Sequence, residues 1–277
     1  MDDLERRKTI EPKFGLILPP VIDPRTIPLR ALVKLKLLPP LPDSFDVDVD
    51  LEGVTDNNMF GNDVHSDCVK AAIAHFILRL EKFEQGIIIP ITADEVVADY
   101  FRETGGADSG LVFTYAMKDW RNAGIAVGGK TYTIDAFTGI DTKDHTQVKY
   151  SIYLLRGFIF GMNVYSTDVD QWRKGEKWHL TGSNGTLEGG HGVYIKAYGD
   201  GVTCITWATE QPMDWDFFDA RTIQAYAVVD NKDEWLGDNS PINIPLMESY
   251  LKEITGTADT NNSGCSPLGL IKRLLTK

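Results

Sequence analysis

The sequence contains no apolar run long enough to cross a membrane, because no stretch reaches eighteen apolar residues. Its first eight residues, Met1 to Lys8, are rich in charge and lack the apolar core of a signal peptide. These two absences predict residence in the cytoplasm of the producing cell, or incorporation into a larger particle. Neither absence bears on what the protein does.

Basic residues are comparatively few. The chain has 28 Lys and Arg against 40 Asp and Glu, which gives a formal net charge of −12. Nucleic acids and anionic membranes are bound by clustered basic side chains, so neither is expected as a main partner. The hydrophobic content of 43% over 277 residues is ordinary for a globular protein and allows a large core.

Cysteine is also scarce, and the three cysteines (Cys68, Cys204 and Cys265) are far apart in the sequence. An odd number without any Cys-x-x-Cys spacing argues against a disulfide scaffold and against a zinc site. The glycine-rich segments are not followed by Gly-Lys-Ser or Gly-Lys-Thr, so a phosphate loop is not expected. We therefore expect no metal and no cofactor.

Proline is abundant in only one region, since eight of the thirteen prolines fall within residues 1–42. Proline fixes φ and removes a hydrogen-bond donor, which excludes a regular sheet or a long helix there. The same segment carries many aliphatic residues, so it is predicted to be an extended arm rather than a free linker. Such an arm can pack on its own domain, dock to a partner, or cover a cleft as a propeptide does. We expect a globular domain over 43–235 and a C-terminal extension over 236–277.

Helical patterns come first in the domain and strand patterns come later. Apolar residues recur at helical spacing over 69–83, and a capping box at Thr92 to Glu95 begins a second helix. A third helix is predicted over 115–122. The later patterns predict a short helix over 149–155 and strands over 131–137, 157–164, 191–197, 202–207 and 225–229. This segregation indicates the α+β class, with an N-terminal helical lobe and a C-terminal antiparallel sheet lobe.

Cys68 and His191 are the residues that indicate chemistry. Cys68 directly precedes the apolar run 69–76, and His191 opens an apolar stretch more than a hundred residues later. A helix N-terminus favours the thiolate, and a histidine brought close can exchange the proton of the thiol. The backbone N–H of Cys68 and the side-chain amide of Asn62 are natural donors to an oxyanion. The pattern predicts acyl transfer, most simply by a cysteine peptidase.

The residues directly before Cys68 and His191 are expected to influence the site. Asp67 places a negative charge beside the thiol, which would raise the thiol pKa. Gly190, directly before His191, leaves room for a substrate chain to approach the imidazole.

The order of these residues resembles that of papain-like cysteine peptidases over roughly residues 56 to 230. More narrowly, it resembles a divergent set of such proteins found in bacteriophage and bacterial genomes. In this family a glutamine stands six residues before the nucleophile, where this chain has Asn62. Trp207 resembles the family's tryptophan on the strand after the histidine. The resemblance implies a papain-like fold, with Cys68 and His191 as the catalytic pair and Trp207 beside the cleft.

The chain departs from the family's pattern at Ile205. Papain-like enzymes place an asparagine two residues before the tryptophan to orient the imidazole, and an apolar isoleucine cannot do this. The neighbouring Thr206, or a carboxylate brought in by the fold, is the candidate for the third residue.

Three functional hypotheses follow. The first is hydrolysis of a peptide or isopeptide bond in a protein or peptide substrate by Cys68 and His191. The second is an inactive structural or interaction module, such as a phage particle component that docks through the proline-rich arm. The third is an amidase or transglutaminase-like activity, because the acyl acceptor is chosen by the pocket rather than by the catalytic pair.

Overall fold

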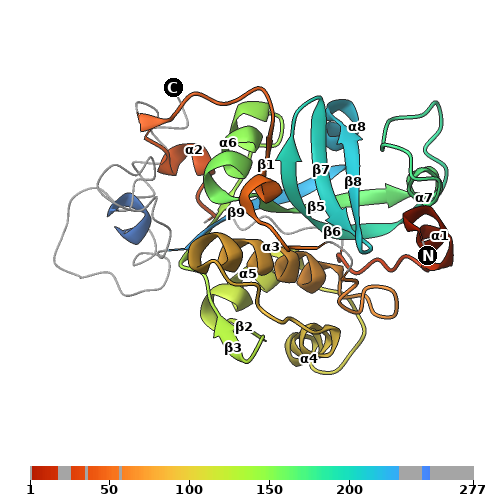
Figure 1. The fold of residues 1–277 in the computed structure, drawn as a ribbon, viewed down its shortest axis with the longest axis horizontal. Coiled ribbons are helices and arrows are strands. Elements are labelled where there is room, and N and C mark those ends of the chain that lie inside the picture. The colour runs from red at the N-terminus through yellow and green to blue at the C-terminus, as the bar shows by residue number, and fades with distance from the viewer. Residues whose placement is uncertain (1, 18–25, 35–36, 56–57, 231–244, 250–277) are drawn as a thin grey trace.

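The structure is a computed structural model that describes residues 2–17, 26–34, 37–55, 58–230 and 245–249. Helices dominate the first part of the described chain, and an antiparallel sheet accompanied by shorter helices dominates the later part (Figure 1). The predicted α+β class, with helices first and strands later, is confirmed. The predicted C-terminal extension lies almost entirely outside the described residues, and so does Cys265; residues 245–249 are helical.

The three predicted helices of the first half are present as α3 (Cys68–Gln85), α4 (Ala93–Thr104) and α5 (Phe113–Asn122). Helix α3 ends at Gly86, whose φ of 69° is the left-handed conformation that glycine adopts without strain. Helix α4 begins with the capping box predicted at Thr92 and Glu95. Helix α3 is buried from its first residue to Glu81, because it lies between the other helices and the sheet.

The main sheet has the strand order β4-β9-β5-β6-β7-β8, with β1 paired to β6, and every pairing is antiparallel. Strand β6 is the longest and carries His191 opposite Met162 of β5. The strands are β1 (Phe45–Asp46), β4 (Ala136–Gly139), β5 (Phe158–Tyr165), β6 (Leu187–Tyr198), β7 (Gly201–Thr206), β8 (Thr209–Asp214) and β9 (Thr222–Val229).

Two predicted elements differ from the structure. The strand expected over 131–137 is two strands, because β3 (Lys130–Tyr132) pairs with β2 (Ile125–Val127) in a separate hairpin while β4 joins the main sheet. Apolar alternation runs through both, so the pattern does not show where one sheet ends. The helix expected over 149–155 is α6 (His145–Leu155). It starts a turn earlier because Asp144 caps it by accepting a hydrogen bond from the backbone of Thr146.

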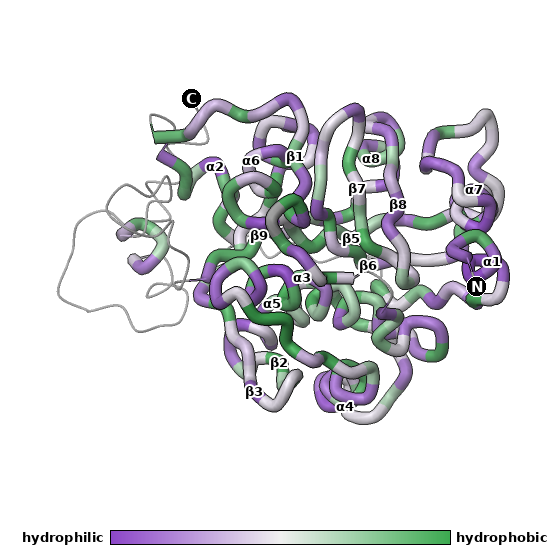
Figure 2. The backbone as a smooth tube through the Cα atoms, in the orientation of Figure 1, coloured by the Kyte–Doolittle hydropathy of each residue, from purple (hydrophilic) through white to green (hydrophobic). Residues whose placement is uncertain are grey.

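The remaining helices are short. They are α1 (Asp3–Thr9), α2 (Leu29–Leu32), α7 (Ser166–Arg173), α8 (Trp215–Arg221) and the 3-10 helix η2 (Val47–Asp50). Helices α1 and α4 lie on the outside and are mainly hydrophilic (Figure 2). No helix of the described residues is both long and apolar enough to pass through a bilayer.

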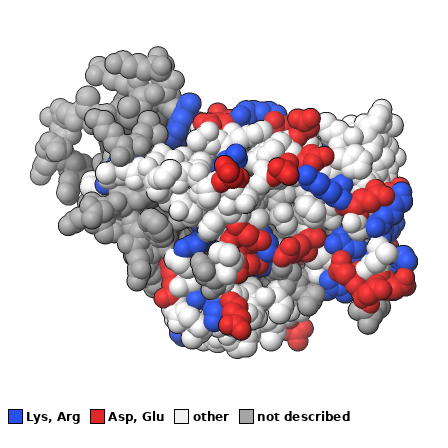
Figure 3. Space-filling model, turned by 45° about the horizontal axis from the view of Figure 1, so that its top comes forward, with Lys and Arg blue, Asp and Glu red and all other residues white. Residues whose placement is uncertain are grey.

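Buried ion pairs connect α3 to its surroundings. The ammonium of Lys70, 1% exposed, lies 2.6 Å from Asp99 and 2.8 Å from Glu103 of α4. Arg79 further along α3 binds Asp48 of η2 at 2.7 Å. On the outer surface, acidic and basic side chains lie side by side over the face shown in Figure 3. The ion pairs fix the position of the helix that begins with Cys68.

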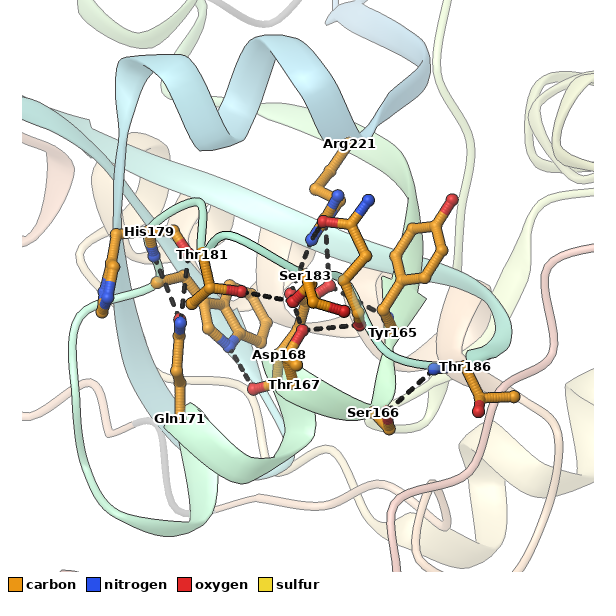
Figure 4. A network of polar contacts seen from close by, with 12 residues as sticks. Tyr165, Ser166, Thr167, Asp168, Gln171, His179, Thr181, Ser183, Thr186 and Arg221 are labelled. Atoms are coloured by element: carbon orange, nitrogen blue, oxygen red, sulfur yellow. Dashed lines mark hydrogen bonds and ion pairs between the residues drawn. The ribbon is translucent and has the colours of Figure 1, made fainter.

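A second polar network fixes the approach to β6 (Figure 4). Asp168 of α7 accepts two hydrogen bonds of 2.9 Å from Arg221, and both side chains are buried. Arg221 also donates to the side chain of Asn184, while Ser166 and Thr186 are joined by two hydrogen bonds. These hydrogen bonds hold the connection from α7 to β6 in place shortly before Gly189 and Gly190, which precede His191.

Candidate active site

Cys68 is the first residue of α3, and its side chain is buried at 1% exposure. The sulfur accepts a hydrogen bond from the backbone N–H of Gly192 at 3.3 Å. Burial raises the pKa of the thiol to about 12, and this outweighs the backbone N–H groups of Gly192 and Gly15, which act to lower it. The thiol is therefore protonated in the form that the structure describes.

His191 lies on β6 and is also 1% exposed. Its Nε2 lies 2.7 Å from the hydroxyl oxygen of Thr206, whereas its buried Nδ1 has no hydrogen bond. Burial lowers the pKa of the imidazole to about 3, so the ring is neutral. If Nε2–H donates to Thr206, Nδ1 presents a lone pair that can accept a proton. Ile205 makes no contribution of this kind, because it is packed in the core.

Trp207 covers the imidazole of His191. The two rings are stacked, with centroids 4.4 Å apart and an angle of 19° between their planes. Trp207 and Ala208 form the two-residue turn between β7 and β8, and both have a left-handed φ, of 43° and 58°. Such turns favour asparagine or glycine, so this one is strained. We infer that the strain is tolerated because the turn holds the indole on the imidazole.

One small cavity connects the residues that the sequence singled out. Its volume is about 10 Å³, which is room for about one water molecule. Gly190 does not line it and faces the N-terminal arm instead. The cavity is lined by Asn58, Met59, Asn62, Cys68, Ala71, Ala72, His75, His191, Gly192, Ile205, Thr206 and Trp207. The structure thus brings together the proposed nucleophile, base, orienting residue and oxyanion donor.

Asn62 lines the cavity together with Cys68, and its side chain lies close to Asp67. The Asn62 side chain is buried, and its amide donates to the carbonyl of His65 at 3.3 Å. Burial raises the pKa of Asp67 to about 8, and the neighbouring Asn62 acts in the opposite direction. The charge that we expected beside the thiol is therefore absent at neutral pH, and burial of the sulfur is the main reason that the thiol pKa is raised.

The N-terminal arm crosses this site. The backbone of Leu16 donates to the carbonyl of Gly190 on β6 at 3.0 Å, and Ile17 donates to the carbonyl of Leu111 at 3.0 Å. Phe14 packs edge-on against both His191 and Trp207. The arm therefore joins the sheet half to the helical half directly over the catalytic pair.

Gly15 is the arm residue nearest to the nucleophile. A Cβ at this position would lie 1.8 Å from the carbonyl oxygen of Ser66, so no other residue fits there. The Gly15 carbonyl accepts a hydrogen bond of 2.7 Å from Leu111, while its N–H faces the sulfur of Cys68. The arm thus presents a backbone N–H group to the thiol.

The arm is fixed on both sides of this crossing. On α1, the buried guanidinium of Arg7 donates to the carbonyls of Trp172 and Glu210 and to the side chain of Gln211. On the other side, Pro28 forms a bridge with Gly139 of β4. These contacts could not be predicted from the sequence. The only signal was the apolar run around Gly15 within a proline-rich segment.

Comparisons with known proteins agree with this architecture. No family model matches the sequence, and no curated protein is similar to it at a significant level. Xylellain, a cysteine protease from Xylella fastidiosa, has a TM-score of 0.61 at 16% identity, over 79% of this chain and 98% of its own. ProCathepsin B S9 from Trypanosoma congolense has a TM-score of 0.54 at 15% identity, over 81% and 87%.

Digestive procathepsin L 3 of Tenebrio molitor larval midgut has a TM-score of 0.55 at 13% identity, over 83% of this chain and 79% of its own. At such low identity these likenesses show the fold alone. The chain has a papain-like fold, as the sequence predicted.

Proposed function

We propose that this protein is a papain-like cysteine peptidase whose nucleophile is Cys68 and whose base is His191. The observation that carries the proposal is the arrangement of the imidazole. Its Nε2 is held by Thr206, its Nδ1 has no hydrogen bond, and His191 lines the same cavity as Cys68. A neutral imidazole with one nitrogen fixed and the other free is suited to take a thiol proton.

The reaction then follows from the positions of these groups. The sulfur attacks the carbonyl carbon of a peptide bond while His191 takes the thiol proton. The negative oxygen that forms is bound by the backbone N–H of Cys68, in the first turn of α3, and by the amide of Asn62. His191 passes its proton to the leaving amine, which leaves a thioester. Water, deprotonated by His191, releases the carboxylic acid and restores the thiol.

The form described here is proposed to be latent. Gly15 and Leu16 occupy the place above the catalytic pair, and the arm turns an N–H group towards the sulfur. The solved structures with the same fold include proforms, among them procathepsin L 3 and proCathepsin B S9. Displacement of the arm would admit both solvent and a protein or peptide substrate.

Cleavage of peptides tests this function. We would incubate the full chain carrying Gly15→Ala, which disfavours the docked arm, with a mixture of peptides derived from a proteome, and identify new N-termini by mass spectrometry. Cleavage that disappears in the Cys68→Ala and His191→Ala versions of the same chain supports the proposal. Cleavage that persists in Cys68→Ala, or is absent although Cys68 reacts with thiol reagents, contradicts it. Membership of the bacteriophage and bacterial branch stays a prediction from the sequence.

A further inference from the structure

Asp67 occupies the N-cap position of α3 without capping the helix. An aspartate at this position ordinarily accepts hydrogen bonds from the N–H groups of the first turn. Here the side chain makes no such bond, is 0% exposed, and has no well-formed hydrogen bond at either carboxyl oxygen, although the Asn62 side chain lies close enough to favour its ionised form. An unpaired carboxyl beside a nucleophile is destabilising when it is charged, so its presence requires a physical reason.

The surroundings of Asp67 leave space for the carboxyl and for little else. Gly61 has a φ of 97°, and a Cβ on it would lie 2.8 Å from Oδ2 of Asp67. Asn62, the proposed oxyanion donor, follows directly and influences the ionisation of Asp67.

The titratable groups around the carboxyl are mainly acids. Asp63 of the same loop and Asp108 of the loop after α4 both disfavour the charged form of Asp67, as burial does. A charge on Asp67 raises the pKa of Tyr100 of α4, whose hydroxyl donates a hydrogen bond to Asp108. The imidazole of His65 lies 3.3 Å from the same Asp108 carboxylate. Cys68 is the other neighbour, and an ionised Asp67 raises its pKa. This environment keeps the proton on Asp67 at neutral pH.

We propose that Asp67 is a positioning residue for the oxyanion site and that it acts only while protonated. The effect of Asp67 on catalysis presupposes the proposed peptidase function. The neutral carboxyl leaves an amide N–H of Asn62 available to the oxyanion. The ionised carboxyl attracts that N–H to itself and adds a negative charge next to the oxyanion. Ionisation of Asp67 therefore removes one of the two oxyanion donors.

Two reactions of the same thiol separate this effect from simple thiol ionisation. Acylation of Cys68 by p-nitrophenyl acetate develops an oxyanion, whereas alkylation by iodoacetamide does not. In the full chain carrying Gly15→Ala, the ratio of acylation to alkylation should fall as the pH passes the pKa of Asp67. Loss of an oxyanion donor costs roughly 10²-fold, which sets the size of the fall.

The matched variants are Asp67→Asn and Asp63→Asn. Asp67→Asn is neutral at every pH and should keep the ratio constant. Asp63→Asn removes an exposed acid that disfavours the charged form of Asp67, so the ratio should still fall, at a slightly lower pH than in the parent chain. The proposal is overturned if the ratio in Asp67→Asn falls as in the parent. It is also overturned if Asp67→Asn is acylated at no pH while alkylation continues.

A measurement without catalysis keeps the two proposals distinguishable. The carboxyl ¹³C resonance of Asp67, assigned by its loss in Asp67→Asn, should titrate near pH 8, and the side-chain amide of Asn62 should shift with the same midpoint. Titration near pH 4, or an Asn62 amide that does not follow, refutes the role of Asp67. A Cys68 of the Gly15→Ala chain that is alkylated but acylated at no pH refutes the peptidase proposal, and the NMR titration then decides on Asp67 alone.

Discussion

Replacing Gly15 with alanine places a methyl group where the protein has no room for one. The added Cβ would lie 1.8 Å from the carbonyl oxygen of Ser66, and real Cβ contacts do not come closer than 3.0 Å. Relief requires the arm or the Ser66 backbone to move by more than about 1 Å. The Ser66 backbone is held in place by Asp108, which accepts from its N–H at 2.8 Å. We therefore expect the arm to move.

The energy that holds the arm in place is small enough for this. Burial of Leu16 contributes about 2 kcal/mol, and the three backbone hydrogen bonds to Gly190 and Leu111 contribute about 1 kcal/mol each. Ordering the backbone of residues 14–17 opposes this by about 1 to 2 kcal/mol per residue. The edge-on contacts of Phe14 with His191 and Trp207 add about 1 kcal/mol each, so about 7 kcal/mol of attraction opposes an ordering cost of about 4 to 8 kcal/mol, and the net docking energy of this segment is at most about 3 kcal/mol. A difference of 1.4 kcal/mol is a factor of about 10 in the closed population.

The assay is the rate of iodoacetamide labelling at Cys68 near neutral pH, read by peptide mapping. Gly15→Ala should raise this rate by about 10- to 100-fold over the wild type, while the buried Cys204 of the same chain stays unreactive. Gly182→Ala is the matched control, because a Cβ there meets no atom within 4 Å. Equal labelling of Cys68 in all three proteins would refute the reasoning that the arm controls access.

Four further predictions test other parts of the structure. Thr206→Val in the Gly15→Ala chain should slow acylation of Cys68 by about 10- to 100-fold, because the imidazole of His191 loses its hydrogen bond to the hydroxyl. Thr206→Ser should restore most of the acylation rate, and a rate that valine leaves unchanged would contradict the orienting role of Thr206. Arg7→Ala should raise wild-type labelling of Cys68 by about tenfold by loosening the arm near α1, and unchanged labelling would show that this anchor is dispensable. Asp168→Ala should lower the free energy of unfolding by about 3 to 5 kcal/mol in urea titrations, since it leaves a buried guanidinium unpaired, and a loss below 1 kcal/mol would show that the pair is unimportant. Folding raises the pKa of Asp67 from 3.8 to about 8, so the free energy of unfolding of the wild type should fall by at most about 6 kcal/mol as the pH rises from about 4 to about 8. Asp67→Asn should lose this pH dependence, and parallel pH profiles of the two proteins would contradict the assignment.

The parts of the fold that could be predicted from the sequence are those set by local patterns. Helix α3 follows from its apolar spacing and from Gly86 at its end, and α4 follows from the capping box at Thr92. The strand pattern over 131–137 was misleading, because alternation shows which side chains are buried and not which strands pair. Helices α1 and α8 are seven residues each and have too few turns for a periodic signal.

The candidate site shows the same division. Cys68 and His191 could be paired because their chemistry requires a partner, and Thr206 because Ile205 cannot orient an imidazole. The position of Gly15 could not be predicted, because its fit depends on the Ser66 carbonyl more than fifty residues away. The neutral state of Asp67 likewise depends on burial by other segments of the chain, and the residue type alone does not predict that burial.

The two anchors of the arm, at Arg7 and at Pro28, make its docking over Cys68 an intramolecular event. A tethered segment competes with a free substrate at an effective concentration that short tethers raise to the millimolar range, whatever the concentration of the protein. Dilution would therefore not activate the intact chain. A single cut between residues 17 and 26 would change the molecularity, because the released segment could then dissociate and dilution would favour the open form. Inhibition that depends on protein concentration after such a cut, and not before it, is the kinetic signature of this geometry.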